Sequence, residues 1–181
     1  MTSITQHRSP LELAAIISKT LEGAGLTAVL SGGAAVSIYT DGRYESSDLD
    51  FVSSEQISKL AAALAPLGFT QTGGRHFEHP NSDYYVEFPP GPLAVGGLPI
   101  TAWDRLHTDL GVIQVLSPTQ MVMDRLAAFI HWNDPPSLDQ AVLIAQKHSL
   151  DWKSVEDWIS REGGQEEYET FRRALRRATT D

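Results

Sequence analysis

The segment between residues 26 and 52 restricts the possible fold of this 181-residue chain more than any other segment. Leu26 to Ser31 is apolar and short enough for a buried strand, and Gly32-Gly33 separates it from a helical stretch, Ala34 to Tyr39. After a polar loop, Asp48 to Val52 alternates acidic and apolar side chains, as a half-buried strand does. The pattern therefore predicts two strands joined by a glycine turn, a short helix and a loop.

The two aspartates of the second strand predict a cation site. Side chains alternate across a strand, so Asp48 and Asp50 share one face while Leu49 and Phe51 face the core. Two carboxylates about 7 Å apart on one face repel each other unless a cation lies between them. Hard oxygen ligands of this kind suit Mg²⁺ or Mn²⁺, which take water and substrate phosphates as their remaining ligands.

The glycine pair predicts a contact with phosphate. Glycines between a strand and a helix let the backbone approach a phosphate closely, and the N–H groups at the helix start face the anion. Ser31, beside Gly32 and Gly33, either donates a hydrogen bond to phosphate or caps the turn. An isolated Asp-x-Asp occurs often by chance, and an isolated Gly-Gly often marks a turn. The interpretation as a cation and phosphate site therefore depends on the two motifs occurring together in this order.

Taken together, Gly32-Gly33 and Asp48-x-Asp50 resemble the nucleotidyltransferase superfamily, whose members are built around a polymerase-β-like core. In that superfamily a strand ends in Gly-Gly or Gly-Ser, and an Asp-x-Asp strand follows after a helix and a loop. The resemblance extends over residues 27–88. It implies an α+β fold with a mixed β-sheet flanked by helices. It also implies metal-dependent transfer of a nucleoside monophosphate from an NTP to a hydroxyl acceptor.

The resemblance assigns the metal site to three acidic residues. Asp48 and Asp50 would bind the ion that bridges the triphosphate. Glu87, on a later predicted strand, would join Asp50 at a second metal position and help deprotonate the acceptor hydroxyl. Two metal ions would then stabilise an in-line displacement at the α-phosphate, with pyrophosphate as the leaving group. The alternative for Glu87 is an ordinary surface residue of its strand.

Two arginines are candidates for binding the triphosphate. Arg125 lies on a helix predicted to begin with a capping box at Ser117. This region resembles bacterial nucleotidyltransferase-like proteins, some from toxin–antitoxin systems, in which a basic residue of the helix faces the triphosphate. The alternative is an ion pair of Arg125 with Asp124 or Asp134 on the helix surface. Arg43, in the loop before the aspartates, could contact phosphate when that loop closes.

The character of the chain changes at residue 117. Helices and strands alternate before this point, and only helices are predicted after it. We therefore expect a nucleotidyltransferase-like α/β core over residues 1–116 and an all-helical C-terminal region over residues 117–181. The other predicted helices lie at about 10–22, 53–66, 137–148, 151–161 and 165–177, the other predicted strands at 69–72, 75–79, 84–88 and 111–116, and a loop at 89–99.

Composition bears on partners and location. The net charge of −9 argues against a surface that coats nucleic acid, although the arginines of residues 172–177 form either a local basic patch or a solvated helix face. The absence of cysteine excludes disulfides and thiolate metal sites. No apolar run is long enough to span a bilayer, and the first residues lack the apolar segment of a secretory signal. We therefore expect a cytoplasmic location and no membrane partner.

The acceptor and the biological role remain open. A tRNA 3′ end, a protein or a small hydroxylated molecule such as an aminoglycoside all suit the predicted fold, because a fold does not determine a substrate. The toxin–antitoxin resemblance adds an antitoxin as a possible partner. The main alternative function is a non-catalytic nucleotidyltransferase-like binding or regulatory module. A further alternative is that Asp48 and Asp50 cap a turn in an unrelated α/β protein.

Two other residue types receive structural interpretations. The histidines do not have the spacing of a zinc site, so we interpret them as structural or surface residues. The tryptophans are interpreted as core anchors between helices rather than as a platform for stacking bases. These residues are His76, His79, His107 and His131, and Trp103, Trp132, Trp152 and Trp158.

Overall fold

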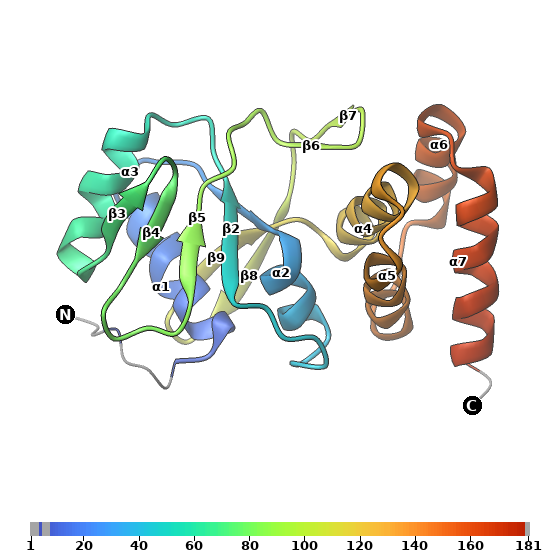
Figure 1. The fold of residues 1–181 in the computed structure, drawn as a ribbon, viewed down its shortest axis with the longest axis horizontal. Coiled ribbons are helices and arrows are strands. Elements are labelled where there is room, and N and C mark those ends of the chain that lie inside the picture. The colour runs from blue at the N-terminus through green and yellow to red at the C-terminus, as the bar shows by residue number, and fades with distance from the viewer. Residues whose placement is uncertain (1–3, 5–7, 180–181) are drawn as a thin grey trace.

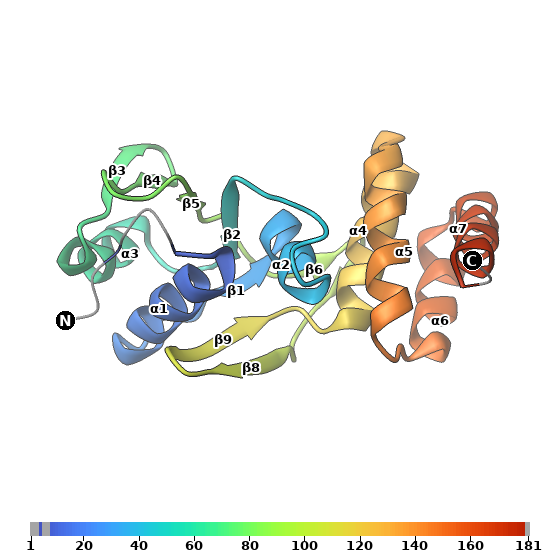
Figure 2. The ribbon, with the colours of Figure 1, turned by 90° about the horizontal axis from the view of Figure 1, so that it is seen from below.

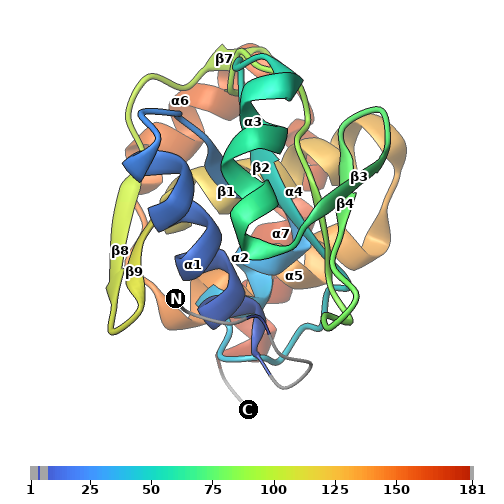
Figure 3. The same cartoon turned by 90° about the vertical axis from the view of Figure 1, so that its left-hand side faces the viewer.

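The computed structural model describes residue 4 and residues 8–179, and these form a layered arrangement of helices and sheet. Figure 1 shows α1 (Pro10–Gly23) and α3 (Ile57–Leu64) beside a mixed sheet, with α2 (Gly32–Tyr39) between the sheet and the C-terminal helices. Seen from the side in Figure 3, α1 and α3 lie in front of the strands and cover one face of the sheet. Among the described residues, no helix is both long enough and apolar enough to cross a membrane.

The main sheet has seven strands in the order β3-β4-β5-β2-β1-β9-β8. β2 pairs in parallel with β5, and β1 pairs in parallel with β9, whereas the other neighbours are antiparallel. The predicted α+β class with a mixed sheet is therefore confirmed. The strands are β1 (Val29–Ser31), β2 (Asp48–Val52), β3 (Thr70–Gly73), β4 (His76–Glu78), β5 (Tyr85–Glu87), β8 (Asp104–Thr108) and β9 (Gly111–Val115).

The predicted alternation of the second strand is confirmed by its burial. Leu49 and Phe51 of β2 are fully buried, while Asp48 and Asp50 are only partly buried. Phe51 stacks on Phe88 with ring centroids 6.1 Å apart, on the face of the sheet that faces the core. Because successive side chains of a strand point to opposite faces, the aspartates are directed away from this aromatic cluster.

The C-terminal helices are α4 (Pro118–Trp132), α5 (Pro135–Lys147), α6 (Trp152–Glu162) and α7 (Gln165–Ala178). Figure 2 shows α4 and α5 next to α2, with α6 and α7 on their far side. The Nε2 atom of His148 lies 2.7 Å from the carbonyl oxygen of Tyr39, and the Tyr39 hydroxyl donates to the carbonyl of Leu116 at 2.8 Å. The His148 contact attaches the end of α2 to the helical region. The division into two domains stays a prediction.

Local sequence signals predicted most helix starts correctly. The capping box at Ser9 is present, and in the one at Ser117 the backbone N–H of Gln120 donates to the serine hydroxyl at 3.3 Å. The Pro135-Pro136 pair occupies the first turn of α5, so that helix begins before the predicted Ser137. Proline suits the first turn because its missing N–H would have no partner there.

Several sequence predictions were wrong. The helix predicted from Ser53 begins at Ile57, because the Ser53 hydroxyl donates to the carbonyl of Thr27 at 2.7 Å. The predicted loop 89–99 contains a small separate sheet, and β8 was not predicted. Trp132 is 77% exposed and is not a core anchor, whereas Trp158 is buried as predicted. The strands of the small sheet are β6 (Ala94–Val95) and β7 (Leu98–Pro99), and a 3₁₀ turn, η1 (Ala65–Leu67), follows α3.

Candidate active site

Strand pairing places three predicted site residues in one line across the sheet. Asp50 of β2 is the register partner of Ser31 on β1 and of Glu87 on β5. On the next strand, β4, His76 is the register partner of Glu87. Directly opposed residues of neighbouring strands share a face of the sheet. We call these four residues, Ser31, Asp50, Glu87 and His76, the site row.

The glycine turn lies directly against Asp50. Gly32, the first residue of α2, has a φ of +63°, a backbone conformation that favours glycine. A Cβ atom at Gly32 would overlap the Oδ2 atom of Asp50. The start of α2, with the N–H groups that suit an anion, therefore lies next to one of the two predicted cation ligands. This juxtaposition is the one that the sequence motif predicted.

Asp48 is oriented by a serine that sequence analysis did not single out. The Ser46 hydroxyl donates to the Oδ1 atom of Asp48 at 2.6 Å and lies 3.1 Å from the backbone oxygen of the same residue. Gly33 allows this arrangement, because a Cβ atom there would lie only 2.6 Å from Ser46 Oγ. Both glycines of the pair thus make room for the groups around the aspartates.

Burial and neighbouring like charges both disfavour ionisation of Asp50. Burial, followed by the charges of Asp48 and Glu87, raises the pKa of Asp50 from 3.8 to about 6. Arg125 on α4 acts in the opposite direction and lowers the pKa, while Asp124 raises it. Asp50 therefore lies within electrostatic range of these two residues of α4. The negative charges around Asp50 outweigh the positive charge of Arg125.

Glu87 is held by His76. The Nδ1 atom of His76 lies 3.1 Å from Glu87 Oε1, and its Nε2 atom lies 3.1 Å from Oε1 of Glu78. The hydrogen bond to Glu87 is the main cause that raises the pKa of His76, and Glu78 adds to it. The ring also packs on Tyr85, with centroids 4.5 Å apart. The Oε2 atom of Glu87 accepts no hydrogen bond within residues 8–179.

The other predicted site residues take different positions. The guanidinium of Arg125 pairs with Asp124 Oδ2 at 2.5 Å and lies 3.3 Å from Gln140 Oε1. The ion pair with Asp124 is one of the two alternatives to phosphate binding that the sequence predicted. Arg43 is exposed on its loop, where it assists Lys147 in lowering the pKa of Asp41, and the structure does not bring it into the site row. The Ser31 hydroxyl donates weakly to the carbonyl of Asp50 at 3.5 Å and makes no capping bond to α2.

Asp48 and Asp50 have the ligand chemistry that a divalent cation prefers, but the described residues form no three-residue metal cluster. Within the part of the chain that the structure describes, no three histidine or acidic side chains are gathered closely enough to hold a metal ion. Asp48 and Asp50 supply hard oxygen ligands from one strand face, and their mutual repulsion would be relieved by a cation. Mg²⁺ typically binds one or two carboxylates and takes its other ligands from water and phosphate. A site of this kind therefore needs no third protein ligand.

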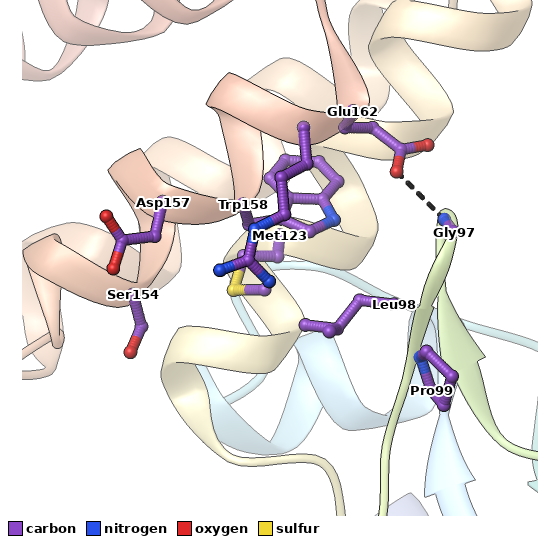
Figure 4. A pocket seen from close by; sticks show the side chains of 9 residues that line it. Gly97, Leu98, Pro99, Met123, Ser154, Asp157, Trp158 and Glu162 are labelled. Carbon is purple, nitrogen blue, oxygen red and sulfur yellow. Dashed lines mark hydrogen bonds between the residues drawn. The ribbon is translucent and has the colours of Figure 1, made fainter.

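Two surface cavities differ in their relation to the aspartates. One, of about 560 Å³, is lined by Ser46 and Ser47, which directly precede Asp48, and by Asp83 and Tyr84, which precede β5. The other, of about 470 Å³, lies between the β6–β7 hairpin and α6 (Figure 4). Its lining contains none of the predicted site residues. The lining of the first cavity contains none of them either, but its Ser46 donates a hydrogen bond to Asp48.

Ser46 and His76 are the site residues that sequence reasoning missed. Ser46 lies two residues before Asp48, so its proximity was visible in the sequence, but its hydrogen bond to Asp48 depends on how the loop folds. His76 received a structural or surface interpretation because its sequence neighbours showed no metal-ligand spacing. Only the register of β4 against β5 reveals that it opposes Glu87. Register between strands depends on turn geometry and core packing rather than on a local motif.

The comparisons with known proteins found structural similarity alone. No protein-family profile matches the chain, and no curated protein matches it in sequence. A crystal structure of ANT(2″)-Ia in complex with adenylyl-2″-tobramycin is similar, with 17% identity, a TM-score of 0.49, and coverage of 91% of this chain and 95% of that chain. A solution structure of the antibiotic-resistance factor ANT(2″)-Ia has 15% identity, a TM-score of 0.49, and coverage of 94% and 92%.

Proposed function

We propose that this chain is a metal-dependent nucleotidyltransferase that moves a nucleoside monophosphate from an NTP to a hydroxyl acceptor. The observation that carries the proposal is the contact between Gly32 and Asp50. It joins a helix start suited to phosphate and a carboxylate pair suited to a cation in a single place. If Asp48 and Asp50 only capped a turn in an unrelated protein, Asp50 would not need to lie against the start of a helix.

Asp48 and Asp50 would hold Mg²⁺ or Mn²⁺, with Ser46 fixing the orientation of Asp48. A bound cation would neutralise negative charge on the triphosphate. Backbone N–H groups at the start of α2 would bind phosphate oxygens, and Arg125 would add positive charge if it exchanged Asp124 for phosphate. A place for Glu87 at a second metal position stays a prediction.

Glu87 would accept the proton of the acceptor hydroxyl. The acceptor oxygen then forms its bond to the α-phosphorus, and the bond from the α-phosphorus to the bridging oxygen breaks. Pyrophosphate leaves with the electron pair of the broken bond. The Oε2 atom of Glu87 suits this role, because His76 is bound to Oε1 and no described residue donates a hydrogen bond to Oε2. The nature of the acceptor is open among RNA, protein and small hydroxylated molecules, and an antitoxin partner stays a prediction from resemblance.

The test is release of pyrophosphate and labelling of acceptor by α-labelled NTPs, with tRNA, a protein and an aminoglycoside supplied separately. The double variant Asp48→Ala/Asp50→Ala should abolish labelling of the true acceptor, because both cation ligands are removed. Asp109→Ala, an exposed turn residue, serves as the matched control and should leave labelling unchanged. Circular dichroism checks that both variants fold.

The outcome separates the proposal from its main alternative. Labelling that survives in the double variant would show that the aspartates do not perform the reaction. Metal-dependent NTP binding without pyrophosphate release, for every acceptor supplied, would favour a regulatory binding module instead.

A further inference from the structure

The imidazole of His76 bridges two carboxylates from neighbouring strand positions. Its Nδ1 atom contacts Glu87 and its Nε2 atom contacts Glu78, both at 3.1 Å. The two nitrogens lie on opposite sides of the ring, so the imidazole connects the carboxylates and cannot chelate one ion with both. The side chain of Glu78 is 58% exposed and that of Glu87 is 45% exposed. His76 therefore connects the more exposed carboxylate, Glu78, to the one in the site row, Glu87.

The surroundings of His76 fix the orientation of its ring. The next residue, Phe77, is fully buried and packs edge-on against Phe88 with centroids 5.4 Å apart, which anchors β4. Tyr85 lies against the face of the imidazole and is the register partner of Asp48. The ring is therefore held by an anchored strand, by an aromatic neighbour and by Glu78. A group held in this way can in turn restrict a flexible side chain.

A glutamate on a half-exposed strand position would otherwise move among several rotamers. The contact with His76 removes this freedom at Oε1 and leaves Oε2 without a protein partner among the described residues. We propose that His76 is a positioning residue that orients Glu87 for the acceptor. This inference rests on the function proposed above. Loss of such supporting hydrogen bonds typically lowers activity about 10- to 100-fold.

The geometry of the two ring nitrogens gives a sharp test. The amide nitrogen of asparagine can take the place of histidine Nδ1, whereas that of glutamine can take the place of Nε2. We therefore expect His76→Ala and His76→Gln to lower kcat about 10-fold or more, with the KM for NTP unchanged. His76→Asn should restore most of the lost kcat, since it replaces the donor to Glu87. His79→Asn, a neighbouring histidine outside the site row, is the matched control.

Thermal unfolding of each variant separates positioning from a merely structural role. Equal Tm values for His76→Asn and His76→Gln, with unequal kcat values, would support positioning. Equal kcat values for these two variants, or a full kcat in His76→Ala, would overturn the inference while leaving the proposed function intact. Absence of turnover in the wild-type chain with every acceptor would instead overturn the proposed function, and the role of His76 with it.

Discussion

Asp50 illustrates how a single carboxylate connects stability with function in this protein. It lies against the backbone of Gly32 and shares its surroundings with Asp48 and Glu87, and burial with these neighbours raises its pKa. In the metal-free protein, ionisation of Asp50 therefore costs more free energy in the folded state than in the unfolded state. Residues that oppose folding in this way tend to occur where function requires them. The sequence predicted the pair, but it did not predict this degree of burial.

The raised pKa of Asp50 makes stability depend on pH. A carboxyl group with a pKa of about 6 in the folded state and 3.8 in the unfolded state binds more protons when folded. The free energy of unfolding should therefore fall as the pH rises from 3.8 through 6, and stay low above that. In EDTA, Asp50→Asn should be more stable than wild type at pH 7.5, by about 1 to 2 kcal/mol after allowance for solvent screening.

Urea unfolding at pH 4 and pH 7.5 measures this difference. The two proteins should converge in stability at the lower pH, because Asp50 is then protonated and uncharged in the folded state. A stability difference that does not change with pH would contradict the electrostatic account of Asp50.

Gly32 and Gly42 form a matched pair for testing the contact with Asp50. Both have positive φ, +63° and +75°, but a Cβ atom at Gly42 would meet no neighbour within 4 Å. Alanine at either position should cost about 1 to 3 kcal/mol of backbone strain. Gly32→Ala should cost more and also weaken metal-dependent NTP binding, because the added methyl displaces Asp50. Calorimetric binding curves showing equal affinity for NTP in both variants would contradict this role of Gly32.

The β6–β7 hairpin is the element that the sequence described least well. Its strands are short and lie in a segment rich in proline and glycine, so local signals indicated a loop. It is held by contacts from distant elements: Trp158 Nε1 donates to the Val95 carbonyl at 3.2 Å, and Gly97 N–H donates to Glu162 Oε2 at 2.8 Å. The second of these bonds is drawn in Figure 4. Helix starts, by contrast, depend on adjacent residues and were predicted well.

Glu162 connects three elements and should contribute measurably to stability. Its second oxygen, Oε1, lies 2.6 Å from His131 Nε2 on α4, so α6, α4 and the hairpin meet at this side chain. Glu162→Ala should lower the free energy of unfolding by about 1 kcal/mol or more, because two hydrogen bonds to a charged group are lost. Asp157→Ala, which removes an exposed pair with Lys153, should cost only about 0.5 kcal/mol. Equal losses in chemical denaturation would show that Glu162 does not hold the hairpin.

As a whole, the molecule has α2 between its sheet and its helical region. The first residue of α2 contacts Asp50, and its last, Tyr39, contacts Leu116 and His148. The order of elements and the alternation of β2 were predictable because they follow from local periodicity. The pairing of Glu87 with His76 was not, because it arises from long-range strand register. The ion pair of Arg125 with Asp124 remained one of two alternatives, since helical spacing permits both.

Binding of a non-hydrolysable NTP analogue, measured by calorimetry with and without Mg²⁺, tests most directly whether the glycine turn and the aspartate pair form one site. Asp48→Asn and Asp109→Asn serve as the test and control variants. We expect wild type and the control to bind the analogue only when Mg²⁺ is present, and Asp48→Asn to lose that binding. Binding that is independent of Mg²⁺, or that is unchanged in Asp48→Asn, would contradict a shared cation and phosphate site.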